Sequence, residues 1–386
     1  MSSPILHAKL SASSAKRWLT CPGSIRMSEG FENKTSVFAE EGTAAHELSE
    51  LKLQKETGVI NKVAFNSKYK KFKKANEYYS SGMDDYTDEY VSLVLEKLHA
   101  YEDAFITLER RVDLTRWVPE SFGTSDVIII ADGVLEVIDL KYGTGVAVSA
   151  EENPQAMLYG LGALNEYDMM YDFHTVRMTI VQIRLGDVST FEISAEDLLK
   201  WGNEFVKPRA ELAMSGEGEC VPDEDACRFC PAKAVCRARA EKNLEIAAYE
   251  FSEPPDKLSK EEIATILLQS PEIKKWLEHV SEYALTQARD HDEHFPGMKL
   301  VEGRSNRIIS NKELAAERLQ AEGFEEIFKP RELLALTKLE KTIGKEAFGN
   351  TLSELIIKPP GKPALVAESD KRPELNTLAS ALDDFK

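Results

Sequence analysis

The chain has 386 residues, of which 42% are hydrophobic and 30% are charged, and its formal net charge is −18. This composition predicts a folded protein with a sizeable buried core rather than a disordered chain. The acidic balance argues against a generic nucleic-acid binder, although a local basic groove can exist on an acidic body. No run of about 18 apolar residues occurs, so no membrane span is expected.

The N-terminus and the cysteines favour a cytoplasmic protein. The first residues, "MSSPILHAKLSASSAKRW", lack the apolar core of a signal peptide. In a reducing compartment, the five cysteines of the chain indicate metal or redox chemistry more than a disulfide framework.

The predicted elements alternate between helices and strands up to about residue 216, and mainly helices follow. This order predicts a mixed α/β core in residues 1–245 and a mainly helical accessory region in residues 246–386, with a Pro-rich extended tail. Helices are expected at 11–28, 36–57, 84–107, 153–167, 195–216 and 258–292, strands at 105–114 and 174–194, and the tail at 358–375.

A β-hairpin is predicted at residues 123–143, with Asp132-Gly133 as its two-residue turn. In that register Asp126 faces Asp139, and their Cβ atoms lie about 4.5–5.5 Å apart. Lys141 follows Asp139 by two residues and therefore points to the same face. The open end of the hairpin thus collects two carboxylates and one ammonium group.

Two interpretations of these charges remain open from the pattern alone. Facing carboxylates destabilise a sheet and raise each other's pKa unless a cation lies between them. Mg²⁺ and Mn²⁺ prefer such oxygen ligands, and a lysine beside the ion could orient or deprotonate a water or stabilise developing charge. The alternative is a solvated hairpin edge with a local ion pair.

Four short motifs follow one another along the chain: "GTAAH" (42–46), "GTSD" (123–126), "DLK" (139–141) and "QAMLY" (155–159). In this order they resemble the G-x-x-x-H, G-x-x-D, (D/E)-x-K and Q-x-x-x-Y motifs of the RecB-like branch of the PD-(D/E)xK nucleases. That branch includes the nuclease domains of RecB and AddB and the CRISPR-associated adaptation exonucleases. The resemblance implies a restriction-endonuclease-like α/β core, with a mixed central sheet flanked by helices.

The resemblance also implies a role for each matching residue. Lys141 positions or activates the attacking water, and Gln155 and Tyr159, one helical turn apart, support the active site or contact DNA. Glu47, beside the histidine, is an extra candidate that the motif does not fix. The implied ligands of Mg²⁺ or Mn²⁺ are His46, Asp126, Asp139 and the backbone carbonyl of Leu140.

The cysteines match the iron–sulfur members of the same branch, which have one cysteine before the nuclease motifs and three after them. Here Cys21 comes first, and Cys227, Cys230 and Cys236 follow with C-x₂-C-x₅-C spacing. The resemblance implies a [4Fe–4S] cluster that pins the two ends of the nuclease domain together, and four thiolates equally suit a structural Zn²⁺. Cys220 is left over and is interpreted as a free buried thiol.

These features predict a metal-dependent deoxyribonuclease that acts on DNA ends or single strands, with exonuclease action favoured by family analogy. A basic segment at 68–79 could hold phosphates and stack bases, or could be a solvated helix face. Its candidate DNA contacts are Lys70, Lys71, Lys73 and Lys74.

Two other functions compete with the nuclease. One is a non-catalytic DNA-binding or assembly protein that keeps the fold and the cluster, and the other is an iron–sulfur redox protein. The whole chain also resembles an uncharacterised family of bacteriophages and prophages. That resemblance implies work in phage replication or recombination in a bacterial cytoplasm, with proteins of those processes as partners, and a homo-oligomer stays open.

Overall fold

The computed structural model describes residues 8–31, 37–131, 133–245 and 260–301, together with scattered residues between 313 and 355. The chain divides into two units, Met1–Tyr283 and Ala284–Lys386. In the second unit, α14 (Lys345–Leu352) is described, whereas the predicted tail at 358–375 lies outside the described residues. Among the described helices, none combines the length and apolar character needed to cross a membrane.

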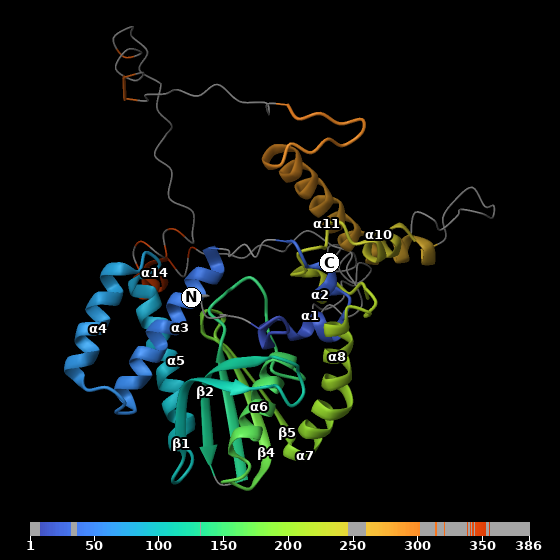
Figure 1. Ribbon diagram of the computed structural model, residues 1–386. Coiled ribbons are helices and arrows are strands. Elements are labelled where there is room, and N and C mark those ends of the chain that lie inside the picture. Colours follow the sequence, from blue (N-terminus) through green and yellow to red (C-terminus); the bar gives the residue numbers. More distant parts are fainter. Residues whose placement is uncertain are drawn as a thin grey trace, which may run out of the picture. The chain divides into compact units, whose positions relative to one another are not determined.

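A five-stranded mixed sheet forms the centre of the first unit, in the strand order β1-β2-β3-β4-β5 (Figure 1). The pair β3/β4 is parallel and all other pairs are antiparallel. A parallel pair needs a long crossover, which the helix between β3 and β4 provides. The strands are β1 (Phe105–Asp113), β2 (Phe122–Ala131), β3 (Gly133–Leu140), β4 (Phe173–Gln182) and β5 (Asp187–Ser194).

Helices cover both faces of this sheet, so the α/β class predicted from the sequence is confirmed. On one face, α6 (Pro154–Tyr167) packs on β1 to β4, and α7 (Ala195–Trp201) packs on β4 and β5. On the other face lie α3 (Val37–Glu56) and α5 (Ser81–His99), drawn in blue in Figure 1.

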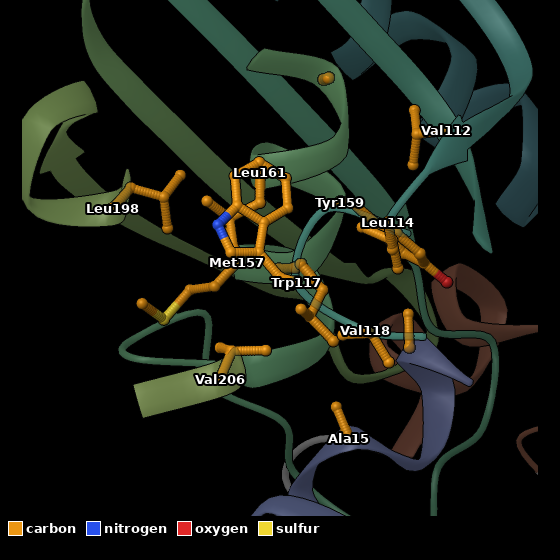
Figure 2. Packing of buried hydrophobic residues seen from close by; sticks show 14 of the residues in the cluster. Ala15, Val112, Leu114, Trp117, Val118, Met157, Tyr159, Leu161, Leu198 and Val206 are labelled. Atoms are coloured by element: carbon orange, nitrogen blue, oxygen red, sulfur yellow. The ribbon is translucent and has the colours of Figure 1, made fainter. Parts of the chain in front are cut away.

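The larger part of the core lies under α6. Figure 2 shows Trp117 among Leu161, Leu198 and Val206 in this cluster. The indole Nε1 of Trp117 donates a 3.0 Å hydrogen bond to Asn203, so its one polar atom is satisfied inside the core. The α6 side of the sheet is therefore a rigid platform for the residues at the sheet end.

The hairpin has the predicted register over its described pairs. Ala131 faces Val134 and Val127 faces Ile138, and Gly133 has a φ of +73°, which favours glycine. Asp132, the other predicted turn residue, lies outside the described residues. Regular pairing ends at Val127, so Asp126 begins the open end of the hairpin.

Most other predicted helices are also present, with two interruptions. The predicted helix at 11–28 is split at Cys21 to Gly23, and the one at 195–216 contains a π-turn at Gly202–Val206. The remaining elements are a 3₁₀ turn at Ala12–Ser14, α1 (Ala15–Thr20), α2 (Ser24–Met27), α4 (Lys62–Ala75), a 3₁₀ turn at Ile183–Leu185, α8 (Lys207–Ser215), α9 (Glu224–Arg228), α10 (Arg237–Leu244) and α11 (Lys260–Asp290).

The first unit includes most of α11 as well as α10. The guanidinium of Arg239 on α10 is buried and donates a 3.0 Å hydrogen bond from Nε to Glu272 on α11. Its Nη1 also lies 3.2 Å from Nδ1 of His279. Because a buried arginine needs such partners, the first part of α11 belongs with the preceding helices.

Candidate active site and cysteine pocket

The first half of the candidate site joins α3 to the open end of the hairpin. Nδ1 of His46 lies 3.1 Å from Oδ1 of Asp126. The other carboxylate oxygen of Asp126 accepts a 2.7 Å hydrogen bond from the backbone amide of Leu140. The structure thus brings together three residues that the motifs singled out, with the amide of Leu140 anchoring Asp126.

Glu109 on β1 is a member of this site that the sequence analysis missed. Ligand atoms of His46, Glu109 and Asp126 all lie within 4.8 Å of one another. Among the described residues, no other group of three or more His, Cys, Asp or Glu side chains is compact enough to surround one ion. Asp139 is not in this group, and its partners are Lys141 and Gln155.

A kink in β1 places Glu109 at the site. Its φ is +46°, a left-handed value that is unusual for a residue with a side chain. Leu108 packs on the α5 side of the sheet, whereas Val112 packs on the α6 side. In a regular strand, residues separated by an even number lie on the same face. Leu108 and Val112 are four residues apart but lie on opposite faces, so β1 is irregular between these two residues. No sequence pattern marks this kink, which explains why Glu109 was missed.

The second half of the site is a hydrogen-bonded chain from β3 to α6. Nζ of Lys141 lies 2.8 Å from Oδ2 of Asp139 and donates a 2.9 Å hydrogen bond to Oε1 of Gln155. The amide nitrogen of Gln155 donates to Asp139 at 3.2 Å and to the hydroxyl of Tyr159 at 3.0 Å. The predicted partners therefore share one network.

The start of α6 is fixed locally, which positions Gln155. The side chain of Asn153 accepts hydrogen bonds from the backbone amides of Gln155 and Ala156, and Pro154 occupies the first helical position. Both are established helix-start signals. The predicted cap is confirmed, and it presents Gln155 to the end of β3.

In the first half of the site, the surroundings favour the cationic form of His46 and the anionic form of Asp126. Burial disfavours charge on His46, but the adjacent Asp126 outweighs it and raises the histidine pKa to about 9. Burial also disfavours charge on Asp126, yet His46 and the Leu140 amide hold its pKa below the ordinary value. His46 and Asp126 are therefore a charged pair.

Two further acids hold their protons more tightly than usual. Burial, with the charge of Asp126 beside it, raises the pKa of Glu109 to about 7. Burial likewise raises the pKa of Asp139, against the opposing effect of Lys141. Lys141 itself has a raised pKa, because Asp139 outweighs the burial that disfavours its charge. Lys141 is thus an ammonium ion at neutral pH.

The donor set of this site fits a divalent cation. One imidazole nitrogen and carboxylate oxygens are ligands that Mn²⁺ accepts, and Mg²⁺ accepts the oxygens. Glu47, the extra candidate, is exposed. Glu50, one helical turn after His46, lines the pocket instead, and its i+4 spacing from the histidine is a signal that could have identified it.

All five cysteines line a second hollow. Cys21, Cys227 and Cys230 are buried, and Cys220 and Cys236 are half-buried. Cys220 was interpreted as a free buried thiol outside the set. It is a free thiol, half-buried rather than buried, and it lines the same hollow, where burial and the neighbouring Cys236 raise its pKa to about 11.

Two chain segments are pressed together to bring Cys21 and Cys220 to this hollow. The amide of Gly23 donates a 3.0 Å hydrogen bond to the carbonyl of Glu219. A Cβ on Gly23 would lie 2.8 Å from the backbone nitrogen of Cys220, so only glycine allows this approach. The amide of Val221 then donates to Sγ of Cys21 at 3.2 Å.

The spacing of the thiols bears on which group they can hold. A tetrahedral Zn²⁺ with Zn–S bonds of about 2.3 Å needs sulfur atoms roughly 3.8 Å apart. All five cysteines are described, and no three of them have sulfur atoms within 4.8 Å of one another. The thiols therefore surround a space wider than a zinc ion needs, and their soft donors fit an iron–sulfur group.

A profile of the family described as "Protein of unknown function (DUF2800)" matches residues 7–373. The chain belongs to this family. The description of the family names no activity. The solved structure titled "Crystal structure of SSO0001" is similar at 15% identity and a TM-score of 0.22, over 58% of this chain and 96% of that one.

In this DUF2800 protein the candidate DNA-contacting lysines lie on α4. Lys70, Lys71, Lys73 and Lys74 are exposed. Nζ of Lys73 lies over the rings of Tyr69 and Tyr79, 5.0 Å and 4.8 Å from their centroids. The structure thus leaves these charges open to solvent and does not join them to the site at the hairpin.

Proposed function

We propose that this protein is a metal-dependent nuclease that hydrolyses phosphodiester bonds of DNA, on a PD-(D/E)xK-like core. The observation that carries the proposal is the convergence of four separate motifs. His46 and Asp126 form one pair, and Asp139, Lys141 and Gln155 form the adjoining network. A solvated hairpin edge needs neither the helix-borne histidine nor the glutamine.

The residues present would hold a divalent ion at the open end of the hairpin, with His46 and Asp126 as ligands and Asp139 beside them. When bound, Mg²⁺ or Mn²⁺ makes water a stronger nucleophile and neutralises charge on a phosphate. The carboxylates supply the negative charge that the ion requires. The hydrogen bond from the Leu140 amide fixes the orientation of the Asp126 carboxylate.

Lys141 acts as a cation in this proposal rather than as a base. Its raised pKa keeps the ammonium group charged at neutral pH. Asp139 and Gln155 fix that group at 2.8 Å and 2.9 Å, so little reorganisation is needed when negative charge develops on a phosphate. Lys141 therefore orients the attacking water and stabilises the phosphate oxygens.

The cysteine pocket would hold a [4Fe–4S] cluster as a structural staple. The wide thiol spacing supports the cluster over a zinc ion. Ligation of Cys21 and Cys227 closes a loop of roughly 200 residues, which restricts the unfolded chain. The staple lies apart from the proposed cleavage site and has no step in the reaction.

The proposed substrate follows from the motif resemblance, and the proposed setting follows from the whole-chain resemblance to a phage and prophage family. DNA ends or single strands would be the substrate, with exonuclease action favoured, and phage replication or recombination in a bacterial cytoplasm would be the setting. The exposed lysines of α4 supply a local basic face on an acidic protein, and phosphates would bind there. Proteins of phage replication or recombination would be the partners.

The test compares end-labelled linear and circular DNA with Mg²⁺ or Mn²⁺. The wild type is expected to degrade linear DNA. Asp139→Asn and Lys141→Met are expected to slow cleavage by at least about 100-fold. The matched control is Glu136→Gln, another buried acid on β3, which pairs with Lys97 away from the site.

Two results would count against the proposal. If wild type and variants all leave the DNA intact but bind it, a non-catalytic DNA-binding protein is the better account. If cleavage survives Asp139→Asn and Lys141→Met, the site is assigned wrongly. Thermal melts of each variant separate loss of chemistry from loss of fold.

A further inference from the structure

A pocket lies on the α5 side of the candidate site, away from Lys141 and Gln155. Its walls come from α3, α5, β1 and the hairpin. Its lining residues include His46, Glu50, Tyr90, Glu109, Asp126 and Leu140. The resemblance gives His46, Asp126 and Leu140 of this pocket a role as ion ligands, but it gives none to Tyr90 or Glu109.

Tyr90 gives the pocket an unsatisfied polar atom. The residue is 1% exposed, and its hydroxyl has no hydrogen-bond partner among the described residues. A buried hydroxyl without a partner is costly, so native proteins supply one from the chain, a ligand or a bound water. The described residues supply none, so the Tyr90 hydroxyl is free to bond a ligand or a water in this pocket.

Glu109 gives the pocket a backbone conformation that is costly to maintain. A non-glycine residue at a φ of +46° carries about 1–3 kcal/mol of strain, and such strain gathers at binding sites. The kink turns the Glu109 carboxylate to within 4.8 Å of ligand atoms on His46 and Asp126. The pairs on either side, Leu108 with Val127 and Arg110 with Ser125, place Glu109 opposite Asp126 in the β1/β2 register.

We propose that Glu109 is a ligand of the divalent ion, on the Tyr90 side of the site, and that the Tyr90 hydroxyl binds a water held by that ion. This proposal deepens the nuclease function and rests on it for the ion's purpose. The ligand set becomes His46, Glu109 and Asp126. Asp139 is then a partner of Lys141 rather than the main ligand.

This set also indicates which ion is bound. Mg²⁺ favours oxygen donors and keeps most of its waters, whereas imidazole nitrogen suits transition metals. One imidazole with two carboxylates therefore favours Mn²⁺ over Mg²⁺. The orphan hydroxyl of Tyr90 further fits an ion that keeps at least one water on that side.

The test measures Mn²⁺ binding to the full chain without DNA, by electron paramagnetic resonance of free Mn²⁺. Glu109→Gln is expected to weaken binding by at least about tenfold, and Tyr90→Phe by a few-fold. The matched control is Glu89→Gln, because Glu89 is an exposed acid on α5 beside Tyr90 that does not line the pocket. It is expected to bind within about twofold of wild type.

Thermal melts check that each variant is folded. If Glu109→Gln does not fold, Glu109→Asp keeps the charge on a shorter side chain and is expected to bind more weakly than wild type. Equal Mn²⁺ affinity in wild type and a folded Glu109 variant overturns the proposal. So does a folded wild type that binds no Mn²⁺.

The metal-binding and cleavage experiments can refute the ligand proposal and the nuclease proposal independently. Mn²⁺ binding that depends on Glu109, in a protein that cleaves no DNA, supports the ligand and refutes the nuclease. DNA cleavage with Mn²⁺ binding that ignores Glu109 supports the nuclease and refutes the ligand. A second series with Mg²⁺ competing against Mn²⁺ tests the metal preference, which equal affinities for the two ions would contradict.

Discussion

The ring of Tyr159 occupies the space that a side chain at residue 123 would need. A Cβ built on Gly123 lies 2.6 Å from Cε1 of Tyr159, closer than any carbon contact allows. The glycine of "GTSD" and the tyrosine of "QAMLY" are therefore one packing unit between β2 and α6. Since the Tyr159 hydroxyl accepts a hydrogen bond from Gln155, this contact helps to set the position of Gln155 relative to Asp139.

Gly123→Ala is expected to destabilise the fold by about 1–3 kcal/mol, because the added methyl group overpacks the α6 contact. Chemical denaturation measures the change. Replacing the ring in the double variant Gly123→Ala with Tyr159→Leu should recover part of the loss. Strict additivity of the two changes would show that the contact is not the cause.

Gly42→Ala is expected to have the opposite effect, although Gly42 also belongs to a motif. A Cβ at Gly42 meets no atom within 4 Å in the described part of the chain, and the residue lies within α3. Alanine is a better helix former, so stability should rise by about 0.5–1 kcal/mol. Destabilisation in the same denaturation assay would reveal a contact that the described residues do not contain.

Gln155→Met should lower the rate of DNA cleavage by about 10–100-fold while leaving the fold intact, since orienting partners of a metal site have effects of this size. Methionine keeps the length of the side chain but cannot bond Lys141, Asp139 and Tyr159. Tyr159→Phe, which loses only the hydroxyl, should have a smaller effect. Single-turnover rates with labelled DNA measure both, and an unchanged rate in Gln155→Met would remove the network from the mechanism.

Metal affinity should rise with pH between 6 and 9. The ion-free protein binds a proton at His46 up to a pKa of about 9 and at Glu109 up to about 7. Both protons compete with the cation, so binding releases them and strengthens as pH rises through each pKa. About two protons should leave per ion below pH 7, and about one between pH 7 and 9.

Mn²⁺ titrations at several pH values measure this dependence. The variant His46→Gln is the control, because it removes the proton with the higher pKa. Its affinity should be weaker and nearly independent of pH above about 8. A wild-type affinity that is flat from pH 6 to 9 would contradict the proposed ligands.

The cysteine pocket should yield a brown protein under anaerobic purification, with stoichiometric iron and sulfide. Cys227→Ser and Cys230→Ser should lose the visible absorption and much of the thermal stability, because the staple over roughly 200 residues is lost. Cys220→Ser is the matched control from the same hollow and should keep the colour. A colourless wild type with stoichiometric zinc would replace the cluster with a structural zinc ion.

A chain that ends at residue 245 should be less stable than one that ends at residue 290. The shorter chain leaves the guanidinium of Arg239 buried without Glu272, and breaking such a pair costs about 3–5 kcal/mol. Arg239→Met in the shorter chain should recover part of the loss. Equal melting temperatures of the two chains would show that α11 contributes nothing to the first unit.

Much of the fold was predictable because its signals are local. The cap at Asn153 fixes the start of α6, and alternating residues around Gly133 fix the register of β2 against β3. The motifs also named His46, Asp126, Asp139, Lys141 and Gln155 before any contact was known. Each of these follows from residue spacing along the chain, because helix and strand geometry determines the direction in which each side chain points.

Other features depend on how distant segments meet, and spacing alone does not encode them. The kink at Glu109 exists because β1 changes face between two cores, and Tyr90 reaches the site because α5 packs across the sheet. Cys220 enters the cysteine pocket because Gly23 and the segment before Cys220 touch. The sequence by itself determined the elements, the hairpin register and the motif residues. Only the tertiary structure decided the third acid, the orphan hydroxyl and the fifth thiol, because each depends on packing between elements far apart in the chain.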